Sequence, residues 1–250
     1  MAYGDGPLES GDKGPEVVEL QMRLAGFLGT VPDGDFGPKT ADQVRAFQHD
    51  YMKMAAPSGI ADLATLAAIA AFGAKYPVSF AQLACPCGTC GGFGKGLHKG
   101  DYWQTPHLEM YHRYEYPGVH KMSLWTYRAA QFYAEAKGWK LRINSGYRCT
   151  VDNLNHKRTS TNHLGKAVDM DIVGLAGKAD EEACDELRAI LQQRANAQIR
   201  WLKANTKAME PGTVGQATNW VHIDVRTYDA KYLDDRYFVK TAAALDAAPA

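Results

Sequence analysis

Residues 166–172 have the sequence KAVDMDI, in which apolar and polar side chains alternate. Successive side chains of a β-strand point to opposite faces of the sheet, so Val168 and Met170 share one face while Asp169 and Asp171 share the other. The apolar face can pack against a core, which leaves the acidic face for a cleft. The stretch therefore predicts a half-buried strand that carries carboxylates into a cleft.

A second strand with the same alternation is expected at residues 220–225, WVHIDV. Its polar face carries Trp220, His222 and Asp224, and its other face is apolar. A further strand is expected at residues 140–145, between amphipathic helices. One expected helix runs from Ser123, which can cap it, to Gly138, which ends it, and another covers residues 180–195. This order predicts an α+β domain around an antiparallel sheet.

Two histidines and an aspartate are expected to meet on this sheet. His163 lies in the turn before the first strand, while Asp169 and His222 lie on the polar faces of the two strands. Three such ligands leave the fourth tetrahedral position of a zinc ion open for water, as in catalytic zinc sites. Because zinc activates that water and polarises a carbonyl, the sequence predicts a hydrolase that needs no serine or cysteine nucleophile.

The N-terminal part of the chain shows three short amphipathic helices joined by Gly- and Pro-rich turns. The first begins near Pro15, the second follows Gly37, and the third begins at Asp62. In the second helix, Thr40 and Gln43 have the spacing of a capping box. The third is expected to bury Leu63, Leu66 and Ile69. The pattern predicts a small helical domain.

Three segments of this helical part also resemble a known family. They are GDKGPEVVELQMRLAGFLG (11–29), DGDFGPKTADQVRAFQ (33–48) and SGIADLATLAAI (58–69). Together they resemble the peptidoglycan-binding type 1 domain over nearly all of residues 8–72. In that family the domain holds an enzyme on the bacterial cell wall and does no chemistry. The resemblance implies peptidoglycan as a partner.

The second part of the chain carries three ordered motifs: SGYRC (145–149), STNHLGKAVDMDI (160–172) and WVHIDV (220–225). Over residues 77–240 they resemble the zinc D-Ala-D-Ala carboxypeptidases and phage L-alanyl-D-glutamate endopeptidases, which share a fold with the hedgehog signalling domain. The resemblance implies three zinc ligands, His163, Asp169 and His222. It also implies that Arg148 holds a substrate carboxylate or carbonyl, a role suited to a guanidinium. Tyr147 and Trp220 are expected beside it at the substrate.

The chain departs from this second family in two ways. The family has one more residue between its histidine and glycine than His163-Leu164-Gly165 provides, so Asp171 becomes a rival ligand to Asp169. The family's general base, a Glu or His shortly before the distal histidine, is also missing. Asp224 is the candidate replacement, or it orients His222 through the second ring nitrogen. Further candidate bases are Glu210 and His156.

Cys85, Cys87 and Cys90 form a C-x-C-x-x-C cluster just before the expected catalytic core. A tetrahedral thiolate site needs a fourth ligand, which Cys149 or His98 could supply. The segment therefore predicts either a disulfide or a metal clip that staples the fold. A nucleic-acid-binding zinc ribbon would need a second C-x-x-C and basic surroundings.

Charge and hydropathy narrow the choice of partners. The formal net charge is zero, so the chain lacks the positive field typical of nucleic-acid binding. No apolar run is long enough to cross a bilayer, and the N-terminus does not resemble an export signal. We expect a monomer that does not bind nucleic acid and does not insert into a membrane. It would be made in the host cytoplasm and reach the wall through a holin pore or within a virion, as a phage endolysin or lysin does.

The patterns divide the chain into a binding domain (8–72), a linker (73–79), a zinc peptidase domain (80–240) and a flexible tail (241–250). We expect a zinc metallopeptidase of the peptidoglycan endopeptidase or D,D-carboxypeptidase type, with Zn²⁺ as cofactor. Because the expected base is missing, the alternative is a non-catalytic, zinc-containing wall-binding or structural phage protein.

Overall fold

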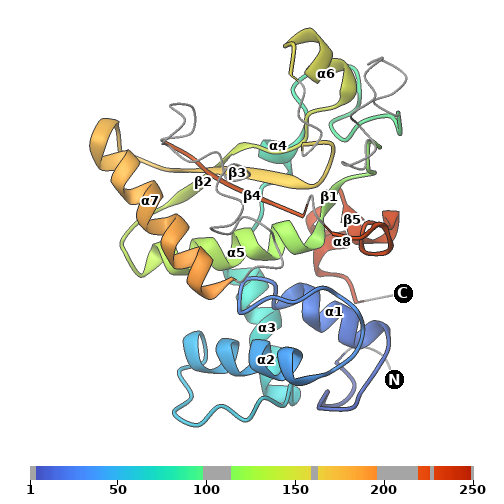
Figure 1. Cartoon of the computed structure of the whole chain (residues 1–250), viewed down its shortest axis with the longest axis vertical. Coiled ribbons are helices and arrows are strands. Elements are labelled where there is room, and N and C mark those ends of the chain that lie inside the picture. Colours follow the sequence, from blue (N-terminus) through green and yellow to red (C-terminus); the bar gives the residue numbers. More distant parts are fainter. Residues whose placement is uncertain (1–3, 98–113, 159–162, 196–218, 226–227, 249–250) are drawn as a thin grey trace.

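The computed structural model describes residues 4–97, 114–158, 163–195, 219–225 and 228–248. The N-terminal part folds as the predicted three helices, which lie together below the rest of the chain in Figure 1. The side chain of Asp62 caps the third helix by accepting the N–H of Thr65 at 2.7 Å, as its position predicts. The helices are α1 (Pro15–Arg23), α2 (Pro38–Asp50) and α3 (Leu63–Lys75).

Two details of these helices were predicted wrongly. Thr40 and Gln43 form no capping box, because both side chains are buried and bind other partners. The Gln43 amide donates to the carbonyls of Gln21 and Leu24 at 3.3 Å each, and so ties α2 to the end of α1. Leu63 is 56% exposed and so is not buried as predicted, because the apolar face of α3 enters the core only from Leu66 onward.

The second part is α+β, as predicted. A three-stranded antiparallel sheet has the order β2-β3-β4, and its register places Asp169 opposite His222. The strands are β2 (Leu141–Ser145), β3 (Ala167–Ile172) and β4 (Val221–Asp224). Val168 and Met170 are fully buried, so the apolar face of β3 does pack against the core.

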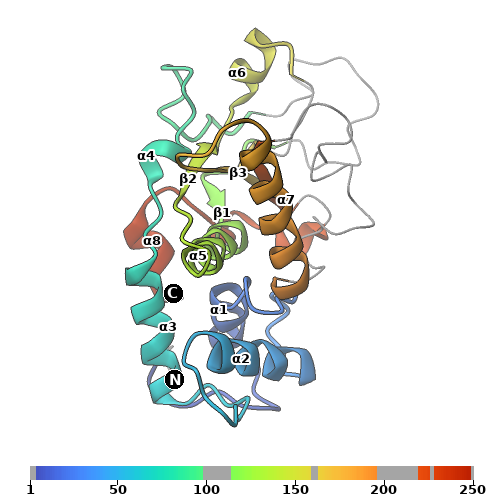
Figure 2. The ribbon, with the colours of Figure 1, turned by 90° about the vertical axis from the view of Figure 1, so that its left-hand side faces the viewer.

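Two helices, α5 (Lys121–Glu135) and α7 (Gly177–Arg194), pack against the sheet and against each other (Figures 1 and 2). The short strands β1 (Val119–His120) and β5 (Phe238–Val239) form a second antiparallel pair. The remaining elements are α4 (Phe80–Leu83), α6 (Thr150–Asn155), η6 (Ala230–Tyr232), η7 (Asp235–Tyr237) and α8 (Ala242–Asp246). Among the described residues, no helix combines the length and apolar character that a bilayer-spanning segment needs.

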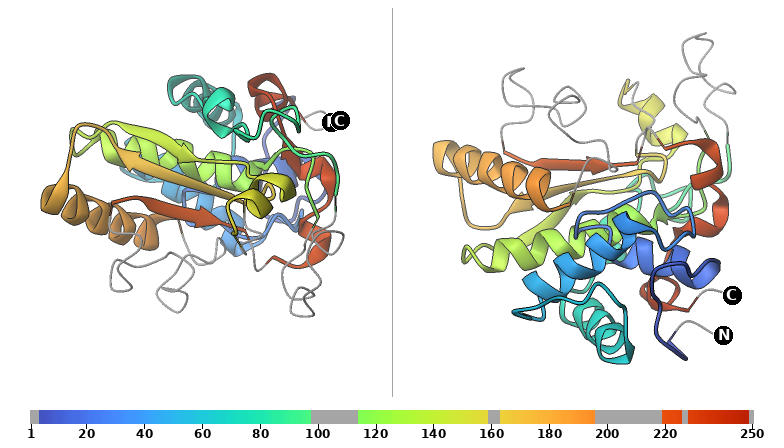
Figure 3. Two further views of the ribbon diagram at one scale, coloured as in Figure 1. Left: turned by 90° about the horizontal axis from the view of Figure 1, so that it is seen from above. Right: turned by 60° about the horizontal axis from the view of Figure 1, so that its bottom comes forward.

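The two parts of the chain share a packed interface. Helix α3 continues through residues 73–75, which the sequence had assigned to the linker. α1 packs against α5, and the ring of Phe72 lies 5.5 Å from that of Phe27 and 6.2 Å from that of Phe132 of α5, measured between centroids, while Phe27 and Phe132 also contact each other at 6.1 Å. Figure 3 shows the N-terminal helices directly beneath α5. The aromatic contacts join the three N-terminal helices to the α+β part of the chain through the core.

The C-terminal segment is folded rather than flexible. Residues 242–246 form α8, in which Leu245 is fully buried. Asp246 accepts two hydrogen bonds from the buried guanidinium of Arg128, at 2.6 and 3.1 Å. An alanine-rich composition gave no hint of this ion pair, so the predicted flexible tail was wrong over these residues.

His120, rather than the predicted Ser123, caps α5. The Nδ1 atom of His120 accepts the N–H of Met122 at 3.2 Å, so the ring proton lies on Nε2, which donates to the carbonyl of Tyr232 at 2.9 Å. Ser123 instead donates to the carbonyl of Lys166, on the strand side. Burial lowers the pKa of His120 to about 4, although the Tyr232 hydrogen bond opposes this shift.

This buried cap makes stability depend on pH. The unfolded chain protonates His120 near pH 6.5 and the folded chain near pH 4, so its stabilisation is complete above pH 6.5 and is lost as pH falls through that interval. We expect His120 to remove about 2 kcal/mol from the free energy of unfolding between pH 7 and pH 5. Urea unfolding at both pH values measures this, with His120→Asn as the control because asparagine also caps helices. Equal losses in both proteins would contradict the prediction.

Candidate metal centre

His163, Asp169 and His222 come together on the polar side of β3 and β4. His163 Nε2 lies 3.2 Å from Asp169 Oδ2, and His222 Nδ1 lies 2.6 Å from Asp169 Oδ1. One ligand atom from each of the three residues lies within 4.8 Å of the other two, and all three side chains are buried. The predicted convergence of these residues is therefore present in the fold.

Each histidine of the cluster has its second ring nitrogen bonded to an acceptor. His163 Nδ1 lies 2.5 Å from the carbonyl of Gly146 and donates to it, so Nε2 is the ring nitrogen that faces Asp169. His222 Nε2 lies 2.6 Å from the carboxylate of Asp224, which leaves Nδ1 facing Asp169. Metal-binding histidines have this arrangement, because the outer acceptor fixes the tautomer and the ring orientation. The donor set therefore fits a zinc ion held by two imidazoles and one carboxylate.

Asp224 lies on the far side of the His222 ring from Asp169. Its carboxylate contacts Nε2, whereas the cluster faces Nδ1, and the residue is fully buried. This position favours the orienting role over the general-base role. Of the other candidate bases, His156 is half exposed and contacts Asp152, and Glu210 lies outside the described residues.

The cluster is strongly polarised. Burial opposes charge on Asp169, but His163 and His222 hold the pKa of its carboxyl group well below the usual range. Burial also opposes charge on His222, but the carboxylates of Asp169 and Asp224 raise its pKa to about 9. Asp169 is thus ionised throughout the neutral range, which a carboxylate needs in order to bind a cation.

The rival ligand Asp171 lies outside the cluster. It pairs with Arg142 of β2 at 3.1 Å, in agreement with the register of the two strands. Burial raises the pKa of its carboxyl group. The structure therefore selects Asp169 over Asp171 as the carboxylate that faces both histidines.

The three predicted substrate-contacting residues have different positions. Arg148 lies at the edge of the cluster, with Nη2 3.3 Å from Asp169 Oδ2 and a side chain that is 23% exposed. Tyr147 is buried and its hydroxyl donates to the carbonyl of Tyr116 at 2.7 Å, so its ring packs in the core, and its predicted substrate contact stays a prediction. Trp220 is half-buried, and its carbonyl accepts a hydrogen bond from Arg188 at 2.5 Å.

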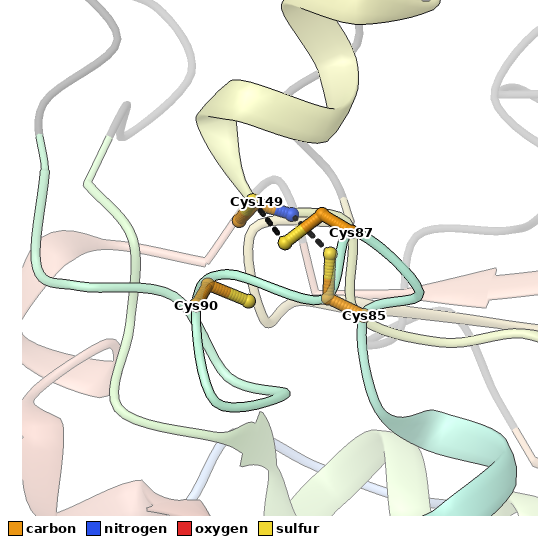
Figure 4. Close-up of side chains that lie close together, drawn as sticks. All are labelled: Cys85, Cys87, Cys90 and Cys149. Carbon is orange, nitrogen blue, oxygen red and sulfur yellow. Dashed lines mark hydrogen bonds between the residues drawn. The ribbon is translucent and has the colours of Figure 1, made fainter.

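The four predicted cysteines form a second cluster. One sulfur each from Cys85, Cys87, Cys90 and Cys149 lies within 4.8 Å of the other three, and the cluster could hold a metal ion (Figure 4). The fourth member is thus Cys149, whereas His98 lies outside the described residues. The structure forms no disulfide among the five cysteines, all of which are described.

Comparison with known proteins bears on the N-terminal helices. Residues 13–69 match the family model of a putative peptidoglycan binding domain. They form a peptidoglycan-binding domain. The match runs from just before α1 into the middle of α3, inside the predicted range of 8–72. It indicates that the protein associates with the cell wall and has peptidoglycan as a partner. No match was found among curated proteins.

One residue that supports the site was missed from the sequence. Glu115 is almost fully buried and accepts the N–H groups of Lys95, Leu97 and Thr150, at 2.7, 3.1 and 2.5 Å. Burial alone would raise the pKa of this carboxyl group, but the three N–H donors together lower it by more, so the net shift of the pKa is downward. Glu115 thereby joins the loop after the cysteines to the start of α6. A lone glutamate between tyrosines gives no sequence signal for such a role.

The orienting role of Asp224 predicts the effect of Asp224→Asn. The amide is a weaker partner for His222 Nε2 than the carboxylate, so we expect zinc affinity at the cluster to fall about 10- to 100-fold. Competition with a chromophoric chelator measures this affinity. Only the zinc that the wild type binds and His222→Ala does not bind is counted, because that zinc is the one held by the cluster. Asp171→Asn, on the neighbouring strand and outside the cluster, is the control and should leave the affinity unchanged. An unchanged affinity in Asp224→Asn would refute the orienting role.

Proposed function

We propose that this protein is a zinc-dependent peptidase that hydrolyses an amide bond in the stem peptides or cross-links of peptidoglycan. The observation that carries the proposal is the pair of histidines whose outer ring nitrogens contact acceptors, Gly146 and Asp224, while their other ring nitrogens face Asp169. This is the donor arrangement of a three-ligand zinc site. The peptidoglycan-binding domain supplies the substrate class.

The residues of the cluster and the residue at its edge have different roles in the proposed reaction. His163, Asp169 and His222 would hold the zinc ion, which when bound supplies Lewis acidity that polarises a carbonyl group and activates water at neutral pH. Arg148 borders a cavity of about 320 Å³ that Arg158 also lines. Two guanidinium groups suit a substrate with free carboxylates, such as a stem peptide. We therefore assign Arg148 to substrate positioning.

The peptidoglycan-binding domain would raise the effective concentration of the wall at the cluster. Its packed interface with α5 holds the binding domain and the histidine cluster together, so the site that binds the wall stays at a restricted distance from the site that cuts it. The motifs resemble those of phage L-alanyl-D-glutamate endopeptidases, and we extend the proposal to a phage endolysin or virion-associated lysin. A monomer suffices for this activity.

Digestion of purified cell walls tests the proposal. We expect new amino termini and defined peptide fragments in mass spectrometry, loss of both after zinc removal by a chelator, and recovery on adding zinc. The fragment masses also identify the bond, whether L-alanyl-D-glutamate, a D-alanyl cross-link or a terminal D-alanine. Full activity in protein shown to be zinc-free would overturn the mechanism.

A second candidate is a non-catalytic, zinc-containing wall-binding or structural phage protein. The observation that favours it is the position of Asp224, which faces the outer nitrogen of His222 and so leaves the base role unfilled by that residue. It predicts bound zinc and sedimentation with cell walls, with no peptide released. The digestion experiment separates the two candidates directly.

A further inference from the structure

We propose that Cys85, Cys87, Cys90 and Cys149 bind a structural zinc ion, and that this thiolate site holds the turn that orients His163 and Arg148. The first half concerns a metal site separate from the histidine cluster and stands without the proposed function. The second half rests on that function, because it assigns the turn a role in substrate and metal binding.

The spacing of the sulfur atoms fits one ion at their centre. All four lie within 4.8 Å of one another, and Cys87 Sγ is 3.5 Å from Cys149 Sγ. In a tetrahedral site with zinc–sulfur bonds of about 2.3 Å, neighbouring sulfurs lie ~3.8 Å apart. Figure 4 shows side chains from two separate segments of the chain pointing to a common centre.

Backbone N–H groups point at three of these sulfurs. Cys85 Sγ accepts from the N–H of Cys149 at 3.3 Å, Cys87 Sγ from Thr89 at 3.4 Å, and Cys149 Sγ from Asp152 at 3.4 Å. An N–H donor stabilises the anionic form of its acceptor. The surrounding backbone is therefore arranged for thiolates, the form in which cysteine binds a metal.

The segment that carries three of the cysteines has no regular secondary structure. Residues 85–97 contain no helix or strand, and the chain turns at Gly88, which has a φ of 72°. Cys85 donates its N–H to the carbonyl of Gly92 at 2.7 Å and closes the loop. A metal ion bound by all four cysteines would crosslink this loop to the turn that carries Cys149, and metal binding of this kind contributes to folding stability.

The fourth cysteine connects this loop to the histidine cluster. Cys149 ends the turn at residues 145–149, in which the carbonyl of Gly146 accepts from His163 Nδ1 and the N–H of Arg148 donates to the carbonyl of His163 at 2.8 Å. Holding Cys149 in place thus holds both hydrogen bonds to His163. The thiolate site would act as a positioning element for the histidine cluster.

Metal analysis of the full chain, purified under reducing conditions, tests the inference. We expect two zinc ions per wild-type chain, and one in the double variant Cys87→Ser/Cys90→Ser. Cys184→Ala is the matched control: Cys184 is buried in α7 outside the cluster, so two zinc ions should remain. In the double variant, the remaining zinc should also be lost at about 10-fold lower chelator concentration than in Cys184→Ala.

Two measurements on the wild type keep the test independent of how the variants fold. Cobalt substitution should give the charge-transfer absorption of thiolate ligands, and titration after denaturation in chelator should find all five thiols. A count of three or one thiols, which means one or two disulfides, would overturn the proposal, as would five thiols without thiolate–cobalt absorption. If His222→Ala keeps the full zinc content while thiolate absorption persists, the thiolate site stands and the proposed function fails.

Discussion

His222→Ala is expected to abolish the release of peptides from cell walls. The imidazole bridges Asp169 and Asp224, so its removal takes away one ligand and leaves two buried carboxylates facing an empty space. Weakening an outer-shell partner costs up to about 100-fold in activity, so loss of a ligand should exceed that factor. Fragment release measured by mass spectrometry, together with zinc content, gives the result.

The matched control for this variant is His156→Ala, since His156 is a half-exposed histidine at the end of α6 and lies outside the cluster. It should digest cell walls at the wild-type rate. Both variants should still sediment with cell walls, because α1, α2 and α3 are untouched. Peptide release by His222→Ala within tenfold of wild type would rule out its role as a ligand.

Glu19→Ala is expected to cost about 3–5 kcal/mol of stability. The carboxylate of Glu19 accepts from Arg23 Nε at 2.7 Å and from Lys121 Nζ at 3.0 Å, and all three side chains are less than 10% exposed. Removing it leaves two cations buried at the junction of α1 and α5. Arg23 keeps its hydrogen bonds to the carbonyls of Asp246 and Ala247 and its position over the ring of Trp125, but these partners carry no full negative charge.

Denaturant unfolding of wild type and variant measures this loss. The control is Asp42→Ala on α2, which breaks an exposed ion pair with Arg45 and should cost less than about 1 kcal/mol. Similar losses in the two variants would show that the buried triad adds nothing beyond a surface pair. The same unfolding curves also test whether the three N-terminal helices and the α+β part of the chain unfold together.

Much of the fold could be predicted because local periodicity and packing agree. The alternation in β3 placed Val168 and Met170 in the core, and it placed Asp169 on the polar face opposite His222. Asp62 caps α3 because its position directly before the apolar run leaves its carboxylate free to accept the N–H of Thr65. Such short-range rules fail only where a tertiary contact competes.

Long-range partners account for the features that were predicted wrongly. Gln43 does not cap α2, because its side-chain amide donates instead to the carbonyls of Gln21 and Leu24. Asp246 pairs with Arg128, although the segment around Asp246 shows no pattern that predicts structure. Asp224 faces the outer nitrogen of His222 rather than the cluster. Each of these depends on residues distant in sequence, which spacing within one element does not reveal.

Anomalous X-ray scattering on either side of the zinc absorption edge, from a crystal of the full chain, tests the central claim most directly. The account predicts a zinc peak within bonding distance, about 2.0–2.2 Å, of His163 Nε2, an oxygen of Asp169 and His222 Nδ1. Well-ordered density for these three side chains in zinc-containing buffer, with no anomalous peak between them, would contradict it.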